Sequence, residues 1–231
     1  ETLGSVGLDY VWLDFEHAGK SPYDSTEFEH LTRAAEAGDT ELLVRLPSGD
    51  PELVRKVLDA GVRTLLIPRV ETADEIREAV EAAHFDYAEG VGERGIAAGR
   101  ASTWGANMND HTTKEDDNIL VGTMIENRAA VQNLDEILSV PELGFAFIGP
   151  SDLSVSLGHP LKTDHPDIRD TVAEIRETCL SADVPVGKIT ADAKSANNAI
   201  EDGFQILRIG GEVSAVRQIL DERIGNICTG N

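Results

Sequence analysis

The sequence has few cysteines, few lysines and no long apolar run. Only two of its 231 residues are cysteines, Cys179 and Cys228, which excludes a disulfide-stapled scaffold and favours a reducing compartment. No apolar run approaches the roughly 20 residues of a membrane-spanning helix, which excludes a transmembrane protein of the usual helical kind. No charged-then-apolar leader stands at the start of the sequence, so we expect a cytoplasmic protein with no membrane partner.

Basic residues are scarce as well: 20 Lys and Arg face 42 Asp and Glu, giving a formal net charge of −22. A field of this sign repels phosphate backbones, so we expect no nucleic-acid partner. Acidic surfaces repel themselves until salt screens the charges, and this predicts a protein adapted to a salt-rich cytoplasm; an ordinary acidic protein is the alternative. Lysine occurs only at positions 20, 56, 114, 162, 188 and 194.

Short apolar runs alternate with amphipathic segments along the whole chain. Several runs are rich in β-branched residues and few alternate cleanly, as is typical of strands buried on both faces of a parallel sheet. We predict seven strands, over residues 10–13, 41–46, 64–68, 118–125, 144–148, 184–189 and 204–209.

Capping signals mark the helices between these strands. Asp50 followed by Pro51 opens one helix, with Gly61 past its end, and Thr72 with Glu75 forms a capping box that opens the next, to about residue 83. Residues 87–117 lack periodicity and predict a long functional loop with about one helical turn. Further helices are predicted over residues 127–138, 167–180, 190–201 and 213–223.

The alternation of strands and helices indicates βαβ units, in either an open doubly wound sheet or a closed (β/α)8 barrel. Seven strands do not close a standard barrel, and residues 1–6 resemble the tail of a helix. We therefore expect a single domain over residues 1–231 whose first strand lies upstream of residue 1.

Polar residues follow four of the predicted strands, at the end where active sites of parallel barrels lie. The first strand runs into Asp14, Glu16 and His17, and the second contributes Arg45. The strand ending at residue 125 is followed by Glu126, and the strand ending at residue 148 by Gly149-Pro-Ser151-Asp152.

These residue types suit one kind of chemistry. Two carboxylates, Glu126 and Asp152, suit a hard divalent cation, whereas no pair of histidines or cysteines has the spacing of a zinc site. Arg45 offers a planar fork for a carboxylate, and His17 is a candidate base near neutral pH. The turn at Ser151 can direct backbone N–H groups at an anion. Metal, carboxylate clamp and base together point to enolisation of a 2-oxo acid.

Seven motifs, in the same order, resemble the HpcH/HpaI family of class II pyruvate aldolases. The resemblance covers nearly the whole chain and implies a (β/α)8 barrel, a homotrimer or homohexamer that often exchanges its last helix, and a divalent Mg, Mn or Co ion. The motifs are Val-Trp-Leu-Asp14-Phe-Glu16-His17, Val-Arg45-Leu-Pro, Leu-Leu-Ile-Pro68-Arg-Val-Glu-Thr, Glu93-Arg-Gly, Gly99-Arg-Ala-Ser-Thr-Trp104, Ile-Glu126-Asn and Phe-Ile-Gly149-Pro-Ser-Asp152-Leu-Ser.

Position by position, the resemblance implies a base at His17, an oxyanion-stabilising arginine at Arg45, and metal ligands at Glu126 and Asp152. Ser151 stands where a backbone amide contacts pyruvate. The family often has Gln at the substrate-facing position 124, where this chain has Met124. A thioether cannot donate the hydrogen bond of an amide, so this departure bears on substrate choice.

The resemblance also implies acidic partners for the base. Asp59 matches a carboxylate that reaches the histidine of a neighbouring subunit. Asp14 and Glu16 match acidic neighbours within the chain, and we expect Asp14 to be the one that acts with His17. The reaction implied is cleavage of a 4-hydroxy-2-oxo acid to pyruvate and an aldehyde.

Four alternatives remain. They are a CoA-ester lyase of the citrate lyase β or malyl-CoA lyase type, a barrel enzyme for phosphorylated substrates, a class I aldolase that forms a Schiff base on Lys188, and a degenerate barrel that only binds. For Lys188 we favour an ion pair at the rim. The remaining histidines lack metal spacing, and we assign them to surface or loop positions: 30, 84, 111, 159 and 165.

Overall fold

A computed structural model describes residues 1–19, 21–86 and 92–227 of the chain; Cys228 lies outside this range. Seven parallel strands form one sheet in the order of the sequence, as predicted. The strands are β1 (Tyr10–Asp14), β2 (Glu41–Arg45), β3 (Thr64–Ile67), β4 (Leu120–Ile125), β5 (Leu143–Ile148), β6 (Val186–Ile189) and β7 (Ile206–Arg208).

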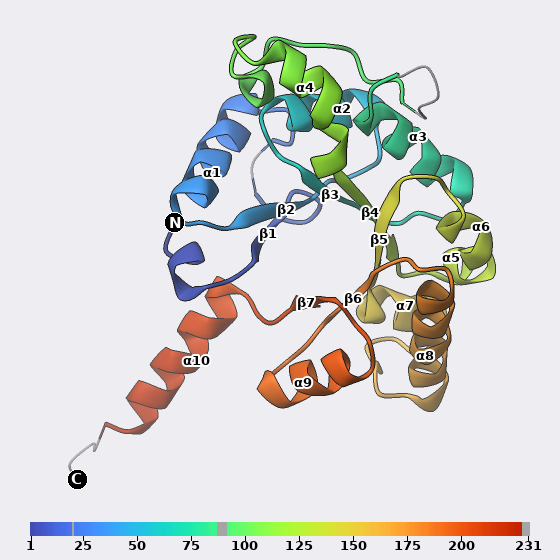
Figure 1. Ribbon diagram of the computed structural model, residues 1–231. Helices are drawn as coiled ribbons and strands as arrows, with labels where there is room; N and C mark the ends of the chain where they lie inside the picture. Colours follow the sequence, from blue (N-terminus) through green and yellow to red (C-terminus); the bar gives the residue numbers. More distant parts are fainter. Residues whose placement is uncertain (20, 87–91, 228–231) are drawn as a thin grey trace.

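The sheet curves into a nearly closed barrel with helices around it (Figure 1), which confirms the barrel over the open sheet. No ladder pairs β7 with β1 in the described part of the chain, but the Tyr10 hydroxyl donates to the Leu207 carbonyl oxygen across this seam at 2.8 Å. Burial raises the pKa of Tyr10 to about 12, so its phenol stays protonated and keeps donating.

Most predicted helices are confirmed. Asp50 caps α2, and Thr72 with Glu75 forms the predicted capping box of α3; caps of this kind stabilise a helix by about 1 kcal/mol. Asp192, two residues later than expected, caps α9. The confirmed helices are α2 (Pro51–Asp59), α3 (Ala73–Ala83), α8 (Pro166–Ser181), α9 (Ala193–Glu201) and α10 (Glu212–Gly225).

Other helices differ from the prediction. The helix expected over residues 127–138 is broken at Asn133, whose side-chain amide donates to the Glu71 carbonyl, so that α5 (Arg128–Gln132) and α6 (Leu134–Leu138) are separate. The segment expected to be a loop contains α4 (Met108–Lys114) and two 3-10 turns; its residues 87–91 lie outside the described range. Two helices were not predicted, α1 (Ser25–Ala37) and α7 (Pro150–Ser156).

Side chains alternate between the two faces of the barrel wall. The outward-facing residues pack against the helices in the larger core, which includes Val44, Leu65, Val121 and Ile148. The inward-facing residues form a smaller cluster that fills the barrel, and its centre is an edge-to-face contact between Trp12 and Phe147 at 4.9 Å. Its other members are Tyr10, Leu43, Leu66, Met124, Phe145 and Ile206. The barrel is therefore solid below its rim.

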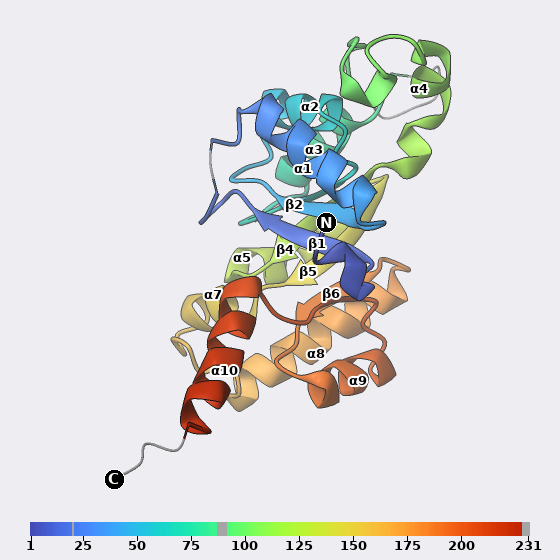
Figure 2. The same ribbon diagram turned by 90° about the vertical axis from the view of Figure 1, so that its left-hand side faces the viewer.

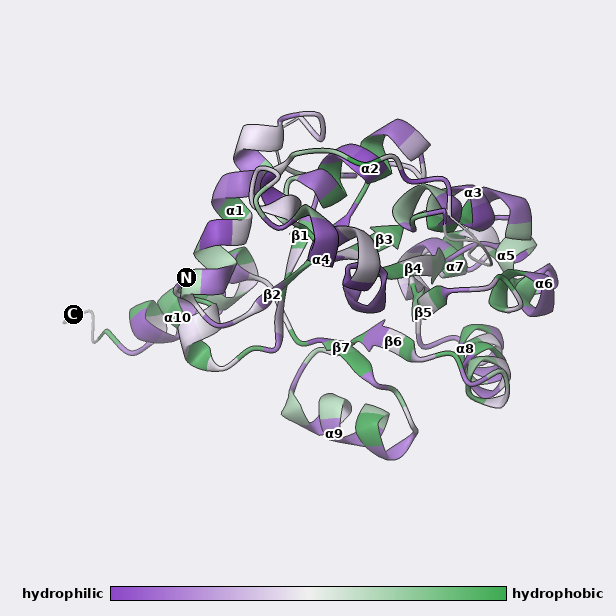
Figure 3. Ribbon diagram, turned by 45° about the horizontal axis from the view of Figure 1, so that its top comes forward, coloured by the Kyte–Doolittle hydropathy of each residue, from purple (hydrophilic) through white to green (hydrophobic). Residues whose placement is uncertain are grey.

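The last helix stands away from the barrel. In Figure 1, α10 projects away from the barrel, and in Figure 2 it lies on the side that faces the viewer. None of its residues is buried. It carries both apolar and polar residues (Figure 3), and its exposed apolar side chains include Val213, Val216, Ile219, Leu220 and Ile224. No helix among the described residues has the length and apolar character needed to cross a membrane.

Candidate active site

The inner face of the barrel turns polar where the strands end. Side chains of a strand alternate between its two faces, so the residue two positions after an inward-facing one also faces inward. On four strands, the residue two positions after an inward-facing apolar side chain is charged. These residues are Asp14 on β1, Arg45 on β2, Glu126 directly after β4 and Arg208 on β7. Strand periodicity therefore places these four charged groups on the same rim of the barrel.

Arg45 is held by two carboxylates. Its Nε and Nη2 donate to Asp14 Oδ1 at 3.0 Å and Asp14 Oδ2 at 2.5 Å, and its Nη1 lies 3.0 Å from Glu16 Oε2. Burial raises the pKa of Asp14, but hydrogen bonds from Arg45 and from the backbone N–H groups of His17 and Glu16 outweigh it and leave that pKa below its usual value. The guanidinium is therefore fixed in direction as well as position.

The imidazole of His17 faces Glu16, not Asp14. His17 Nε2 lies 3.4 Å from Glu16 Oε2, while Asp14 Oδ1 accepts the backbone N–H groups of Glu16 and His17 at 3.0 and 3.2 Å. The expectation that Asp14 acts on the base is therefore wrong for this chain. Asp14 shapes the turn and holds Arg45, because a short Asp side chain reaches nearby backbone donors more easily than a ring beyond them.

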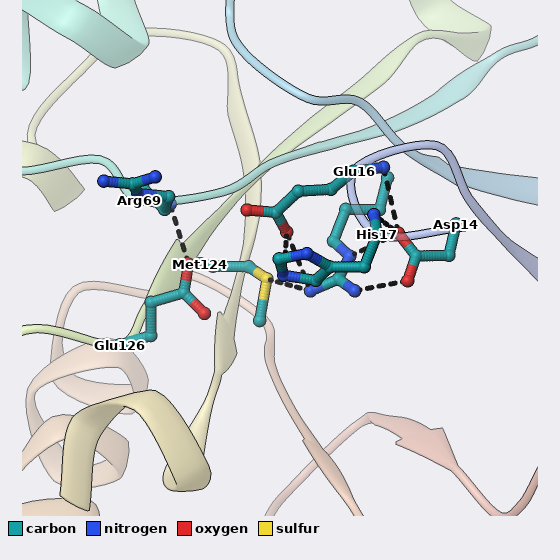
Figure 4. A network of polar contacts seen from close by, with 7 residues as sticks. Asp14, Glu16, His17, Arg69, Met124 and Glu126 are labelled. Carbon is teal, nitrogen blue, oxygen red and sulfur yellow. Dashed lines mark hydrogen bonds and ion pairs between the residues drawn. The ribbon is translucent and has the colours of Figure 1, made fainter. Parts of the chain in front are cut away.

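Glu126 is nearly buried, with 4% of its surface exposed. Its Oε1 accepts the backbone N–H of Arg69 at 2.8 Å, and Figure 4 shows this contact beside Met124. Arg69 has a left-handed backbone with φ of 57°, a conformation that costs a non-glycine residue about 1–2 kcal/mol and here aims its N–H at the carboxylate. Burial raises the pKa of Glu126, and so do the negative charges of Asp152 and Glu16.

Asp152 lies on the same rim, exposed in the first turn of α7. The charge of Asp152 reaches Glu126 and contributes to the raised pKa of that carboxyl group. Gly149 permits this approach: a Cβ there would stand 2.7 Å from Glu126 Oε2 and 3.0 Å from Met124 Cε. The backbone N–H of Ser151, in the same first turn, has no acceptor within the helix.

Met124 contacts the arginine from below. Its Sδ lies 3.7 Å from Arg45 Nη1, and its side chain is buried in the inner cluster. In the view of Figure 4 it lies between Glu126 and the group of Glu16, His17 and Asp14. A weak acceptor therefore occupies a central position of the site.

Asp59 lies far from this rim within one chain. It ends α2, which returns antiparallel to β2, so it stands at the opposite end of the barrel from Arg45. Asp59 Oδ1 accepts a hydrogen bond from Nη2 of the buried Arg94 at 3.1 Å and keeps 29% of its side chain exposed. A surface groove of about 680 Å³ runs beside it, lined by residues that include Tyr23, Arg55 and Arg100.

Lys188 does not point into the barrel. It shares the outward face of β6 with Val186, a member of the outer core, and its Nζ lies 4.8 Å from the centre of the Phe204 ring. Gly187, between them, faces inward toward Phe147. This orientation removes the Schiff-base alternative, since a nucleophilic lysine must reach the inner rim. The predicted ion pair at the rim is wrong too, because the ammonium packs on an aromatic ring.

Arg208 is the residue that sequence reasoning missed. Its guanidinium lies 5.6 Å from the centre of the Trp12 ring, and that of Arg45 lies 5.7 Å from the same ring. No salt bridge to an acidic side chain is found for Arg208 within the described ranges. Its place at the end of the last strand, two residues after inward-facing Ile206, was the available signal.

The donor set of the rim fits a hard divalent ion. Glu126, Asp152 and Glu16 present carboxylate oxygens, and the pKa of Glu126 is raised first by burial and then by the negative charges of Asp152 and Glu16. A cation relieves this repulsion, and oxygen-only ligands suit Mg²⁺ or Mn²⁺. Glu126 and Asp152 are therefore the residues that would hold it.

A parallel (β/α) barrel with a carboxylate-rich rim, a fixed arginine and an adjacent histidine defines the class to which this chain belongs, that of barrel enzymes acting on small anionic substrates. Residues 1–218 match the model of the HpcH/HpaI aldolase/citrate lyase family, and the chain belongs to this family. It is a carbon–carbon lyase of the aldolase type.

Curated relatives support this assignment. The chain is 32% identical over 226 residues to the 2-keto-3-deoxy-L-rhamnonate aldolase of Klebsiella pneumoniae, covering 97% of this chain and 82% of that protein. It is 34% identical over 230 residues to the hydroxypyruvate/pyruvate aldolase of Paraburkholderia phytofirmans, covering 96% of this chain and 87% of that protein.

Solved structures agree. An HpcH/HpaI aldolase/citrate lyase family protein from Burkholderia cenocepacia superposes with a TM-score of 0.87 at 32% identity, covering 96% of this chain and 88% of that one. The HpcH/HpaI aldolase of Desulfitobacterium hafniense gives a TM-score of 0.88 at 29% identity, covering 100% of this chain and 87% of that one.

Proposed function

We propose that this protein cleaves, or forms, a 4-hydroxy-2-oxo acid, giving pyruvate and an aldehyde with the help of a divalent metal ion. The observation that carries the proposal is the convergence of Glu126, Asp152, Arg45 and His17 on one rim of the barrel. The two curated relatives, a 2-keto-3-deoxy-L-rhamnonate aldolase and a hydroxypyruvate/pyruvate aldolase, support this substrate class.

Glu126 and Asp152 would hold Mg²⁺, Mn²⁺ or Co²⁺. A divalent ion bound there supplies Lewis-acid stabilisation of the negative charge that develops on the 2-oxo acid. The buried Glu126 is aimed by the Arg69 N–H, whereas the exposed Asp152 leaves room for substrate and water.

The remaining residues bind the substrate and move its proton. Arg45 stabilises the oxyanion, and the Ser151 N–H binds the carboxylate end. His17 takes the proton of the C4 hydroxyl, directly or through water, while the C3–C4 bond breaks and its electrons remain on the pyruvate enolate. The aldehyde leaves, and a proton returns to C3. Glu16, beside the imidazole, stabilises its protonated form.

We infer a homotrimer or homohexamer in the cytoplasm. Among the described residues nothing covers the exposed apolar side chains of α10, and they suit exchange with a neighbouring copy. Contact with His17 of another subunit remains the role proposed for Asp59, and the exposed part of its side chain beside the groove supports it. The buried free thiol of Cys179 suits a reducing compartment.

Metal-dependent pyruvate release tests the proposal. Sugar-derived and dicarboxylic 2-oxo acids are screened with Mg²⁺ or Mn²⁺ at high salt, and pyruvate is measured with a coupled assay. We expect release that EDTA abolishes and that His17→Ala abolishes, with His30→Ala as the matched exposed histidine. Release that survives both EDTA and His17→Ala would count against the mechanism. Cleavage of CoA esters alone would favour the CoA-ester lyase alternative instead.

A further inference from the structure

Two histidines that are six residues apart come together in the loop between α7 and α8. The rings of His159 and His165 stack, with centroids 3.7 Å apart. The carboxylate of Asp167 joins them: its Oδ2 lies 3.0 Å from His159 Nε2 and 3.8 Å from His165 Nδ1. One ligand atom from each residue lies within 4.8 Å of the others. The spacing His-x5-His-x-Asp matches no familiar metal motif, so the sequence predicts loop positions for these histidines but not their convergence.

We propose that His159, His165 and Asp167 form a second metal site, for Zn²⁺ or another first-row transition ion. Imidazole nitrogens suit Zn²⁺, Ni²⁺ and Cu²⁺, whereas Mg²⁺ prefers oxygen. The site therefore differs in its preferred ion from the carboxylate rim at Glu126 and Asp152, and the proposal does not depend on the aldolase reaction.

The distances are close to what a small tetrahedral ion needs. Bonds of about 2.0–2.1 Å place two ligand atoms of a tetrahedral zinc site about 3.3–3.4 Å apart. The two distances to Asp167 Oδ2, 3.0 and 3.8 Å, bracket this value. The imidazoles must unstack so that both point their lone pairs at one ion, and both side chains have the freedom to do so, with 25% and 32% of their surfaces exposed.

The charges around the cluster favour an added cation. In the described part of the chain, the salt bridges of Asp167 are both with these histidines, and neither a lysine nor an arginine compensates its charge. His165 Nδ1 accepts the backbone N–H of Asp167 at 3.3 Å, and an ion bound to this nitrogen would replace that capping bond. The helix dipole places partial positive charge at the N-terminal end of α8, which disfavours a cation there. The negative charge of Asp167 in the first turn of α8 offsets this repulsion.

An ion here would fasten the loop that follows α7 to the first turn of α8, where Asp167 lies. Two hydrogen bonds already attach the loop to α7. The His159 N–H donates to the Ser154 carbonyl oxygen at 2.7 Å, and the Leu161 N–H donates to Ser154 Oγ at 3.1 Å. Figure 1 shows α7 beside α8, joined by this loop. The site is therefore structural: it joins α8 to a loop that Ser154 already holds on α7.

Zinc titration by calorimetry tests the proposal. Zn²⁺ is added to wild-type protein saturated with Mg²⁺, and to Glu126→Gln, which lacks a proposed ligand of the catalytic ion. We expect one Zn²⁺ per chain in both. His159→Gln and His165→Asn each weaken that binding by about tenfold or more, and Asn is chosen because it can still cap α8. His30→Gln, on exposed α1, leaves it unchanged.

Two further readouts separate ligand loss from misfolding. The metal-free variants keep the wild-type circular dichroism spectrum, and Zn²⁺ raises the melting temperature of wild type but not that of His159→Gln. Pyruvate release with Mg²⁺ is retained in His159→Gln. The proposal is overturned if wild type and Glu126→Gln bind no Zn²⁺, or if both histidine variants bind it as tightly as wild type. The proposed aldolase function would be unaffected by either result.

Discussion

Asp14 and Arg45 are register partners on adjacent strands, and their side chains form a two-point ion pair. Both Asp14 oxygens are used, one with Nε at 3.0 Å and one with Nη2 at 2.5 Å, which leaves Arg45 Nη1 directed at Glu16 and Met124. The β1–β2 pairing thus sets the direction of the Arg45 side chain. Loss of the Asp14–Arg45 ion pair would change the position of the guanidinium that binds the substrate.

Replacing Asp14 tests that relationship. Asp14→Asn is expected to lower the free energy of unfolding by about 1–3 kcal/mol near neutral pH, because a charge-assisted pair is lost. The pKa of Asp14 lies below its ordinary value in the fold, so this stabilisation is complete above the unfolded value of about 3.9 and is lost as the pH falls through the folded value. Urea unfolding at several pH values measures it.

The exposed Asp170 on α8 provides the control, since Asp170→Asn should change stability little at any pH. If the penalty of Asp14→Asn stays the same in acid as at neutral pH, the ion pair is not its cause.

His17 is tested without any aldehyde. Exchange of the methyl protons of pyruvate for deuterium, followed by NMR, reports proton removal and return alone. His17→Ala should slow this exchange by about 10²–10⁴-fold, the usual contribution of a positioned base. Glu16→Gln should slow it less, because the imidazole remains but loses the neighbouring carboxylate. Wild-type exchange in His17→Ala would assign the proton step to another group.

The buried negative charge of Glu126 destabilises the metal-free protein, and a bound cation would remove this destabilisation. Glu126→Gln should stabilise the metal-free protein by about 1 kcal/mol, or roughly 2–4 °C in melting temperature, because a buried carboxylate and its repulsion from Asp152 and Glu16 disappear. It should also abolish the rise in melting temperature that Mg²⁺ causes. Asp152→Asn is the comparison: this exposed residue should lose the Mg²⁺ effect with little gain in stability. A wild-type response to Mg²⁺ in Glu126→Gln would contradict the proposed ligand.

Met124 is expected to weaken binding of an enolate mimic. An amide at this position offers a true donor and acceptor beside Arg45 Nη1, where the thioether sulfur now lies 3.7 Å away. Met124→Gln should therefore bind oxalate about five- to tenfold more tightly in calorimetry with Mg²⁺, the value of one added hydrogen bond. Met124→Leu keeps the volume without the sulfur and should differ little from wild type. Equal affinities for the Gln and Leu variants would show that position 124 does not contact the ligand.

Salt should stabilise the protein. The net charge of −22 repels itself, and the screening length falls to about 3 Å at molar ionic strength. We expect the melting temperature to rise with KCl toward molar concentrations, and to rise less in a non-ionic osmolyte of equal osmolality. A melting temperature that does not rise in KCl would contradict adaptation to a salt-rich cytoplasm and would favour the alternative, an ordinary acidic protein.

Local signals account for the elements that the sequence predicted correctly. The seven strands follow from apolar runs, and α2 and α3 follow from Asp50, Thr72 and Glu75, whose caps depend on residues within one turn. The break at Asn133 was not predictable in this way, because its amide bonds to Glu71 on another part of the chain. α1 was not predicted, although its cap at Asp24 is a local signal of the same kind as Asp50.

The sequence by itself determined the order of the seven strands, the family, and which residues stand at the ends of the strands, because these depend on periodicity and on motifs along the chain. Only the tertiary structure decided that Glu16 rather than Asp14 faces His17, that Lys188 points outward, that Arg208 lies against Trp12, and that His159 meets His165. Such pairings depend on side-chain direction and on the closure of the barrel, which bring together groups that no spacing in the sequence connects.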